Sequence, residues 1–354
     1  MNRADLQDRI RTVTSADFAE LAVAVFRYQA AGNPIYARWL ELLRCDPAGV
    51  RGPTDIPHLP IGLFKRHALQ TGCWEPARVF TSSGTTGATT SRHLLHDEAW
   101  YRTNARRAFE VQYGPLAGRP VLALLPAYLE RTGSSLVFMA DDFIQRSGHP
   151  ASGFFLDDLP GLLALLQRLL TAGEQPLLIG VSFALLDLAD LIKGEAATSN
   201  PFLRARPQVP GKESNSKVGQ DPLLLMETGG MKGRRRELTR PELHARLRAA
   251  FGVRHVHSEY GMTELLSQAY APRDGRFLPA PTLRASLREL TDPGAQPPSG
   301  KTGALNLTDL ANLDTISFLA TDDLGRVYPD GSFEVLGRMD ASDVRGCNLL
   351  VSDV

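Results

Sequence analysis

The chain has 354 residues, of which 43% are hydrophobic and 22% charged, and its 39 basic and 39 acidic residues give a formal net charge of zero. This composition is typical of a globular protein of about two domains, and it lacks the positive charge that nucleic-acid binding usually requires. The three cysteines, Cys45, Cys73 and Cys347, are too far apart for a disulfide framework or a zinc site. With no signal peptide at the charged N-terminus and no membrane span, we expect a cytoplasmic protein.

The first 75 residues are expected to be helical and then irregular. Pro53, Pro57 and Pro60 interrupt any regular element between Asp46 and Ile61. A short strand is predicted at Val79 to Thr81. A helix is predicted from about Asp97 to Tyr113.

The middle of the chain alternates buried strands with helices. Apolar runs of strand length occur at Val121–Leu125, Leu177–Ile179, Leu223–Met226 and His255–His257. Helical patterns lie between them, at Leu159–Leu170, Phe183–Ile192 and from the capping box Thr239–Glu242 to Gly252. Alternation of this kind predicts a largely parallel sheet covered by helices.

The last hundred residues favour short strands, predicted at Ala304–Leu307, Ser317–Thr321 and Phe333–Leu336. We therefore expect an α/β fold with a small β-rich C-terminal part. The predicted division is an N-terminal segment at 1–75 packed on the main domain, an α/β core at 76–300, and a β-rich end at 301–354. The polar, proline-containing stretch 196–221 is predicted to be a surface insertion or mobile loop.

The stretch VFTSSGTTGATTSRH, residues 79–93, is the first candidate binding site. Hydroxyls and glycines fill positions 81–87, namely Thr81, Ser82, Ser83, Gly84, Thr85, Thr86 and Gly87. Such a loop can be a solvated linker, or it can cradle a phosphate with amide and hydroxyl donors while glycines allow close backbone approach. The loop alone does not decide between these interpretations.

Four further polar stretches follow apolar runs, where we expect loops to leave the sheet. Gly229 and Gly230 offer a flat backbone, and Tyr260 offers a ring for stacking. Thr263 offers a hydroxyl, and Glu264 offers a hard oxygen ligand for Mg²⁺. Asp322 and Asp323 offer acceptors for ribose, and Arg338 offers a positive charge.

Taken together and in this order, these motifs resemble those of the adenylate-forming superfamily of acyl-CoA synthetases, adenylation domains and luciferases. The resemblance covers about residues 75–348. It implies that positions 81–87 bind phosphate, that Tyr260-Gly261-Met262-Thr263-Glu264 is the tyrosine–glycine–any–threonine–glutamate motif, that Asp323 binds ribose, and that Gly337-Arg338-Met339-Asp340 is the hinge. It further implies ATP and Mg²⁺, with Glu264 as the metal ligand and Thr263, Glu264 and Arg338 as catalytic residues.

A narrower resemblance is to the LuxE-type acyl-protein synthetases, on wordings such as IPHLPIGLFKRH, HSEYGMTELLSQAY and VLGRMDASDVRGCNLL. It implies activation of a fatty acid and transfer of the acyl group to a thiol near the C-terminus, for which Cys347 is the candidate. A reductase-like acceptor protein or CoA is the expected partner, and an oligomer is possible.

The sequence departs from the superfamily pattern at two places. The phosphate loop lacks its usual lysine, and Arg92 is a candidate replacement unless it is a plain surface residue. The usual mobile C-terminal domain with its catalytic lysine is expected to be missing, since only fourteen residues follow Asp340. Candidates to replace that lysine are Lys65, Lys232, Arg234, Arg235 and Arg236.

Other functions remain open at this point. The main enzymatic alternative is a CoA ligase of the phenylacetate type, and the non-enzymatic one is a nucleotide-binding scaffold for a partner. A serine hydrolase would use Ser182 in Gly180-Val181-Ser182-Phe183-Ala184, although Ser182 also suits a helix N-cap. A metal site would rest on His255 and His257 alone. Side chains that could line an acid pocket, or simply pack in the core, are Phe138, Met139, Phe183 and Met262.

Overall fold

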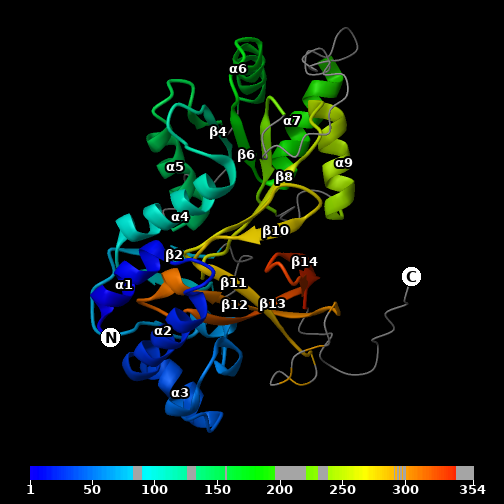
Figure 1. The fold of residues 1–354 in the computed structure, drawn as a ribbon. Coiled ribbons are helices and arrows are strands. Elements are labelled where there is room, and N and C mark those ends of the chain that lie inside the picture. The colour runs from blue at the N-terminus through cyan, green and yellow to red at the C-terminus, as the bar shows by residue number, and fades with distance from the viewer. Residues whose placement is uncertain are drawn as a thin grey trace.

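The computed structural model describes residues 1–82, 90–125, 133–155, 158–195, 221–229 and 238–339, apart from residues 291, 293, 294, 296, 298 and 299. The described strands form one long sheet with an added two-stranded hairpin. Helices cover its upper part in Figure 1, and the N-terminal helices lie at the opposite end.

The N-terminal segment begins with three helices, α1 (Arg3–Thr12), α2 (Phe18–Gly32) and α3 (Pro34–Leu42). Two 3₁₀ turns (Pro47–Gly49 and Pro53–Asp55), the short strand β1 (Leu59–Pro60) and a 3₁₀ helix (Ile61–Lys65) follow. This confirms the expected change from helix to irregular backbone, because prolines open both turns.

One half of the sheet is parallel and carries helices between its strands. In spatial order it contains β5 (Gly153–Phe154), β4 (Val121–Leu124), β6 (Leu177–Gly180), β7 (Leu224–Glu227) and β8 (His257–Tyr260). The connecting helices are α4 (Glu98–Tyr113), α5 (Ser135–Ser147), α6 (Leu159–Thr171), α7 (Ser182–Glu195) and α9 (Arg240–Phe251). The predicted alternation is confirmed, and α9 begins at the predicted capping box and ends at Gly252 with a φ of 65°.

The other half is antiparallel. It contains β9 (Ala269–Ala271), β10 (Arg276–Pro279), β14 (Phe333–Arg338), β13 (Phe318–Val327), β12 (Gly303–Asp309) and β11 (Leu283–Arg288), with a 3₁₀ turn at Leu310–Asn312. Strand β10 joins the halves, since it pairs with β9 on one side and β14 on the other. The expected fold class, a parallel-rich α/β core with a β-rich end, is therefore confirmed.

The N-terminal helices are attached to the β-rich end by buried polar contacts. The Gln29 amide of α2 donates to the carbonyls of Asn312 and Leu313 at 2.9 and 3.1 Å, and the amide N–H of Ser317 donates back to Gln29 at 3.0 Å. The predicted boundaries at residues 75 and 300 remain predictions.

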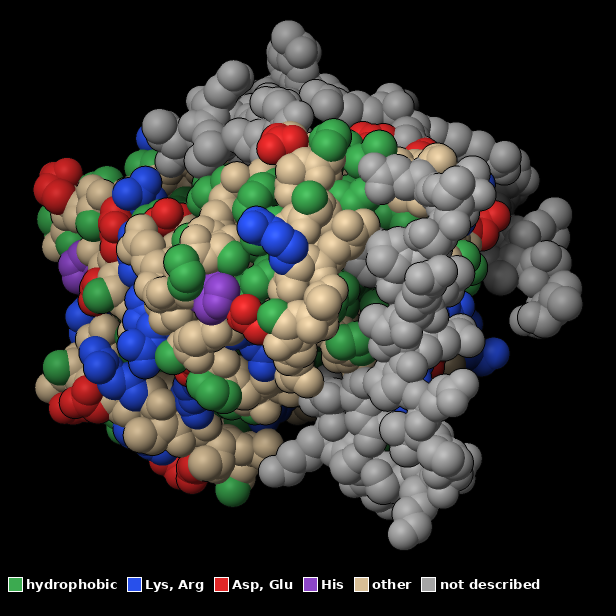
Figure 2. Space-filling model, turned by 90° about the horizontal axis from the view of Figure 1, so that it is seen from above, with side chains coloured by type: hydrophobic (Ala, Val, Ile, Leu, Met, Phe, Trp, Pro, Cys, Tyr) green, Lys and Arg blue, Asp and Glu red, His purple; other side chains and the backbone are tan. Residues whose placement is uncertain are grey.

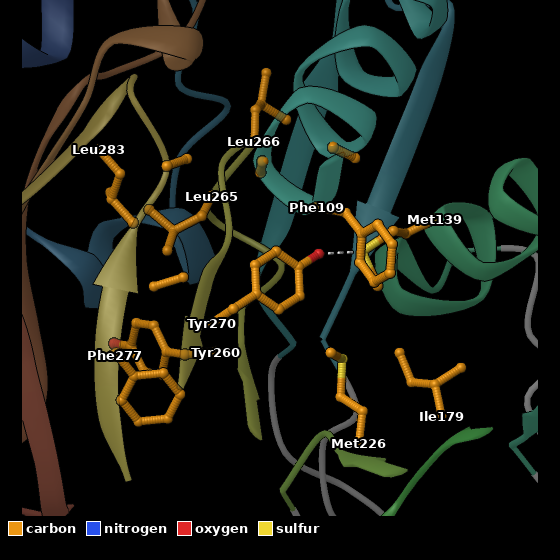
Figure 3. Close-up of a cluster of buried hydrophobic side chains, with 14 of the residues drawn as sticks. Phe109, Met139, Ile179, Met226, Tyr260, Leu265, Leu266, Tyr270, Phe277 and Leu283 are labelled. Atoms are coloured by element: carbon orange, nitrogen blue, oxygen red, sulfur yellow. Dashed lines mark hydrogen bonds between the residues drawn. The ribbon is translucent and has the colours of Figure 1, made fainter. Parts of the chain in front are cut away.

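The core lies between the parallel half of the sheet and its helices. Figure 3 shows Tyr270 of β9 directed at Met139 and Phe109, while Tyr260 and Phe277 lie together on the other side. The predicted lining residues Phe138, Met139 and Phe183 are buried in this core.

No helix in the described ranges is long and apolar enough to cross a membrane. Figure 2 shows acidic and basic side chains interspersed over the upper face.

Candidate functional site

Three polar side chains from distant parts of the sequence meet at the antiparallel half of the sheet. Tyr260 is the last residue of β8, Asp323 lies inside β13, and Arg338 ends β14. The Tyr260 hydroxyl donates to Asp323 Oδ2 at 2.7 Å, and Arg338 Nε lies 3.8 Å from Asp323 Oδ1. Asp323 and Arg338 are also direct partners in the β13–β14 register. The sequence expectation that these residues lie close together is thus met by the fold.

The side chain of Asp323 is mostly buried but keeps a small exposed fraction. Burial raises the pKa of its carboxyl, while the hydrogen bond from Tyr260 and the charge of Arg338 act in the opposite direction. Its side chain is 14% exposed, whereas that of Arg338 is 70% exposed. Asp323 therefore keeps a small exposed fraction, beside a largely exposed cation.

Packing fixes the ring of Tyr260. Its centroid lies 5.6 Å from that of Phe277 and 5.5 Å from that of Phe333, in tilted and edge-on contacts. Tyr260 is buried, so the ring and its hydroxyl hold one orientation. The orientation of the side chain is therefore set by its contacts with β10 and β14.

Glu264 lies in the loop that follows β8 and belongs to the same neighbourhood. Burial raises the pKa of its carboxyl, and the Ser91 hydroxyl and the positive charges of Arg338 and Lys65 oppose that rise. Its backbone carbonyl accepts a hydrogen bond from Asn312 Nδ2 at 2.8 Å. A buried carboxyl facing cationic groups is a hard oxygen ligand suited to a divalent cation.

The hydroxyl-rich stretch forms a hairpin between β2 (Arg78–Thr81) and β3 (Arg92–Leu95). The N–H of Ser82 donates to the carbonyl of Ser91 at 3.1 Å, and the N–H of Ser91 donates to Ser82 Oγ at 2.9 Å. His93 of β3 hydrogen-bonds the Thr263 carbonyl at 2.7 Å, so the hairpin is attached to the loop that carries Glu264.

Several predicted site residues lie outside the part of the chain that the structure describes. Ser83, Gly84, Thr85, Thr86 and Gly87 lie outside the described residues, as do Gly230, Cys347, Lys232, Arg234, Arg235, Arg236 and most of 196–221. Arg92 is exposed and pairs directly with Thr81, at the base of the tip. Their roles remain predictions.

Gly229 follows β7 in a turn that only glycine adopts easily. Its φ is 72°, and its N–H donates to Glu227 Oε2 at 2.6 Å. Burial acts to raise the pKa of Glu227, but His244 and then Arg240 prevail and lower it to about 2. The backbone at Gly229 is therefore positioned by an ionised, buried carboxylate.

One structural expectation was wrong. The stretches around Asp323 and Arg338 were expected in loops leaving the sheet, but both residues lie within paired strands. Similarly, β8 begins at His257, the last residue of the predicted run His255–His257, and extends to Tyr260. The polar positions are tolerated inside the strands because their side chains point to the partly open cluster rather than to the core.

Sequence reasoning missed several supporting residues. Ser91 and His93 were within the quoted hydroxyl-rich stretch, but no role was given to them. Gly133 accepts the N–H of Thr81 at 2.8 Å, and a Cβ there would collide with Thr81. Asn312 and Gly133 carry no local signal, because their roles depend on contacts between distant segments.

The alternative sites gain little from the geometry. Ser182 is buried at the start of α7 and its hydroxyl donates to Glu227 Oε2 at 3.4 Å. His257 is buried against the Tyr113 hydroxyl, whereas His255 is exposed. In the described part of the chain, no group of three or more His, Cys, Asp or Glu residues could hold a metal.

Comparison with solved structures finds the same fold in other proteins. A 2-hydroxyisobutyryl-CoA ligase in complex with 2-HIB-AMP and CoA, in its thioesterification state, superposes with a TM-score of 0.65 at 16% identity, covering 96% of this chain and 73% of that chain. The open conformation of that ligase gives a TM-score of 0.64 at 16% identity, over 96% and 75% of the two chains. Apo MatB from Rhodopseudomonas palustris gives 0.50 at 16% identity, over 77% and 50%.

No protein-family model matches the sequence, and no curated protein matches it. At this level of identity, the structural likeness establishes a shared fold.

Proposed function

We propose that this protein uses ATP to activate a carboxylic acid as an acyl-adenylate and then passes the acyl group to a thiol. The observation that carries the proposal is the meeting of Tyr260, Asp323 and Arg338 beside Glu264 and the base of the hydroxyl-rich hairpin. The fold shared with ligases whose structures hold an acyl-AMP and CoA supports it.

In this proposal, the nucleotide lies across the cluster. Asp323 Oδ1 and Arg338 hold the ribose, Gly229, Gly230, Tyr260 and Gly261 lie along the adenine, and the loop from Thr81 to Gly87 holds the phosphates with amides and hydroxyls. Arg338 also has the reach to bind the α-phosphate, because its side chain is 70% exposed.

Glu264 fits a magnesium ion by its chemistry and surroundings. A buried carboxyl with a raised pKa gains when a cation keeps it ionised. Because the described residues hold no larger ligand group, the remaining ligands would come from phosphate oxygens and water. The ion would offset negative charge on the phosphates.

The first chemical step needs positioning rather than proton transfer. The acid is ionised at neutral pH, so its carboxylate oxygen can attack the α-phosphorus in line. A new O–P bond forms, the bond to the β-phosphate oxygen breaks, and pyrophosphate leaves. Thr263 and Arg338 hold the α-phosphoryl oxygens, and Lys65, whose charge acts on Glu264, is the described candidate for a further cation in this step.

In the second step a thiolate attacks the acyl carbon and AMP leaves. By resemblance to the LuxE type, the acid is a fatty acid and the thiol is Cys347 or that of a partner protein. With CoA as the acceptor, the protein would instead be a ligase of the phenylacetate type. Product analysis with CoA as the sole acceptor separates the two.

The experiment that tests the proposal is acid-dependent exchange of labelled pyrophosphate into ATP, screened over fatty, aryl and amino acids. We expect Glu264→Gln and Asp323→Ala each to reduce exchange at least about a hundredfold, which corresponds to roughly 3 kcal/mol of transition-state stabilisation. Asp322→Ala is the matched control, because Asp322 is exposed next to Asp323 and should keep near wild-type exchange.

Exchange at the wild-type rate in both site variants would remove the proposed site. If the wild-type protein shows an ATP-induced thermal shift but no exchange with any acid, the non-catalytic nucleotide-binding alternative is favoured.

A further inference from the structure

Two buried polar side chains, Glu259 and Gln268, flank Gly261 and are incompletely hydrogen-bonded by the described residues. Glu259 is 9% exposed and Gln268 is 3% exposed. Gln268 Oε1 has no hydrogen-bond partner in the described part of the chain, although the Gln268 side chain bonds the Tyr101 hydroxyl through its other end. Burial and the charge of Glu227, with no hydrogen bond from a described residue, act on the Glu259 carboxyl. Because leaving such groups unpaired costs about 1–3 kcal/mol each, their presence calls for a ligand or another reason.

The strand register places both side chains on one face of the sheet. Glu259 pairs with Tyr270 and Tyr260 with Ala269 in the β8–β9 ladder. Since side chains alternate along each strand, Glu259, Gly261, Gln268 and Tyr270 share one face, and Tyr260 lies on the other. A Cβ at Gly261 would collide with Glu259 Oε1 and would also contact Gln268 Cγ. The two polar groups therefore converge over an exposed glycine.

The surroundings of this pair are mainly aromatic. Tyr270 packs edge-on against Phe109 and Tyr113 of α4, and Figure 3 shows it pointing toward Phe109 and Met139. Tyr101, also on α4, is close enough to Glu259 for their charges to interact, and burial is the larger cause of its raised pKa. The Tyr101 hydroxyl donates to the Ser135 carbonyl at 3.0 Å, and the Gln268 side chain is its other hydrogen-bond partner.

Burial and the nearby charge of Glu227 raise the pKa of Glu259 to about 8. Its carboxyl is therefore mainly protonated at pH 7 and can donate one hydrogen bond. Gln268 Oε1 can only accept. Between them, the two side chains present one donor and one acceptor to the same place.

We propose that Glu259 and Gln268 bind a hydroxyl group on the acid, so that the substrate class is a hydroxy-substituted carboxylic acid. A hydroxyl satisfies both groups, since it accepts from the Glu259 carboxyl and donates to Gln268 Oε1. An unsubstituted chain would leave both unpaired. An ammonium group would require an ionised Glu259, which burial and the charge of Glu227 disfavour. The inference rests on the proposed function and names its substrate class.

The test compares matched acids in pyrophosphate exchange, namely butyric, β-hydroxybutyric and β-aminobutyric acids, the same three derivatives of octanoic acid, and the α-hydroxy acids of both lengths. We expect a kcat/KM for one hydroxy acid at least about tenfold above those of its unsubstituted and amino counterparts. Equal or higher values for the unsubstituted acid overturn the inference while leaving the proposed function intact, and a preference for the amino acid overturns the hydroxyl assignment. If no acid supports exchange, the proposed function itself fails.

Two variants tie the preference to these side chains. Gln268→Leu should reduce the hydroxy-to-unsubstituted ratio of kcat/KM at least about tenfold, whereas Glu259→Gln, which keeps a neutral donor, should change it less than Glu259→Leu. Gln145→Leu, at an exposed position of α5, is the control for a Gln-to-Leu change. ATP-induced thermal shifts report whether each variant is folded. A wild-type ratio in folded Gln268→Leu and Glu259→Leu would show that neither side chain contacts the substrate.

Discussion

Two glutamates on neighbouring strands show how local contacts give one residue type two states. Glu227 is buried beside His244 and Arg240, which keep it ionised. Glu259 is buried without a cation, and the charge of Glu227 adds to the rise of its pKa. Sequence alone shows two glutamates near the ends of strands. Only the packing of α9 against β7 tells them apart.

At the residue scale, the prediction with the sharpest control concerns the acyl-accepting thiol. If Cys347 receives the acyl group, Cys347→Ser should keep acid-dependent pyrophosphate exchange but lose the acyl label bound to the protein. The measurement is incorporation of labelled acid into protein, with hydroxylamine release to identify a thioester. Cys73→Ser is the control, since Cys73 is an exposed thiol and should keep the label. Label retained in Cys347→Ser assigns that cysteine a structural role.

At the scale of elements, the β13–β14 pair holds Asp323 opposite Arg338, and a bulge between Leu324 and Gly325 shapes it. A Cβ at Gly325 would collide with the Glu334 carbonyl and with the Leu305 side chain, both in neighbouring strands. At Gly337, the partner of Leu324, a Cβ would meet nothing within 4 Å.

Gly325→Ala should therefore destabilise the protein by about 1–3 kcal/mol, whereas Gly337→Ala should change stability by less than about 0.5 kcal/mol. Urea unfolding followed by circular dichroism measures both. Comparable stabilities for the two variants would mean that the strand pair has more freedom than its contacts indicate.

The sequence predicted the elements whose signals are local. The proline-rich break, the helix of α4 with Asp97 as its N-cap, and the capping box of α9 all depend on neighbours in the chain. Helix α5 was not predicted, and β8 was misplaced. The positions of Asp323 and Arg338 inside strands could not be predicted either. Polar residues in a strand interior are favourable only when a residue distant in sequence, such as Tyr260, or a ligand binds them.

The same division applies to the candidate site. Glu264, Tyr260 and Asp323 were identified from motifs, and the fold brings them together. Glu259 and Gln268 went unnoticed, although Glu259 lies next to Tyr260. A glutamate in a half-buried strand gives no local sign that it lacks a partner, since that depends on α4 and β9.

At the scale of the whole molecule, buried histidines make stability depend on pH. Burial is the main cause that lowers the pKa of both His93 and His257 to about 4. Between about pH 6.5 and pH 4 the unfolded chain binds more protons at these sites than the folded chain does. Each histidine therefore removes stability as the pH falls through this window, by at most about 3 kcal/mol. Glu259, whose pKa is raised, acts in the opposite sense between about pH 8 and pH 4.5.

Because these contributions oppose one another, the prediction concerns a difference between variants. His93→Gln should lose less stability than the wild-type protein between about pH 7 and pH 5, measured by urea unfolding at each pH. His67→Gln, at an exposed position, should follow the wild-type dependence. Parallel curves for the wild-type protein and His93→Gln would contradict a neutral, buried His93.

The hydrogen bond between Tyr260 and Asp323 also constrains the shape of the sheet. Strands β8 and β13 are four steps apart in the sheet, through β9, β10 and β14, which is about 19 Å in a flat sheet. Yet the Tyr260 hydroxyl lies 2.7 Å from Asp323. The sheet must therefore be strongly curved at β10 and β14, which carry Phe277 and Phe333, so that its two halves face each other. The pairing of these strands sets the distance between the two halves of the sheet. A molecule that contacts both halves must therefore match a distance that a change in one loop would not alter.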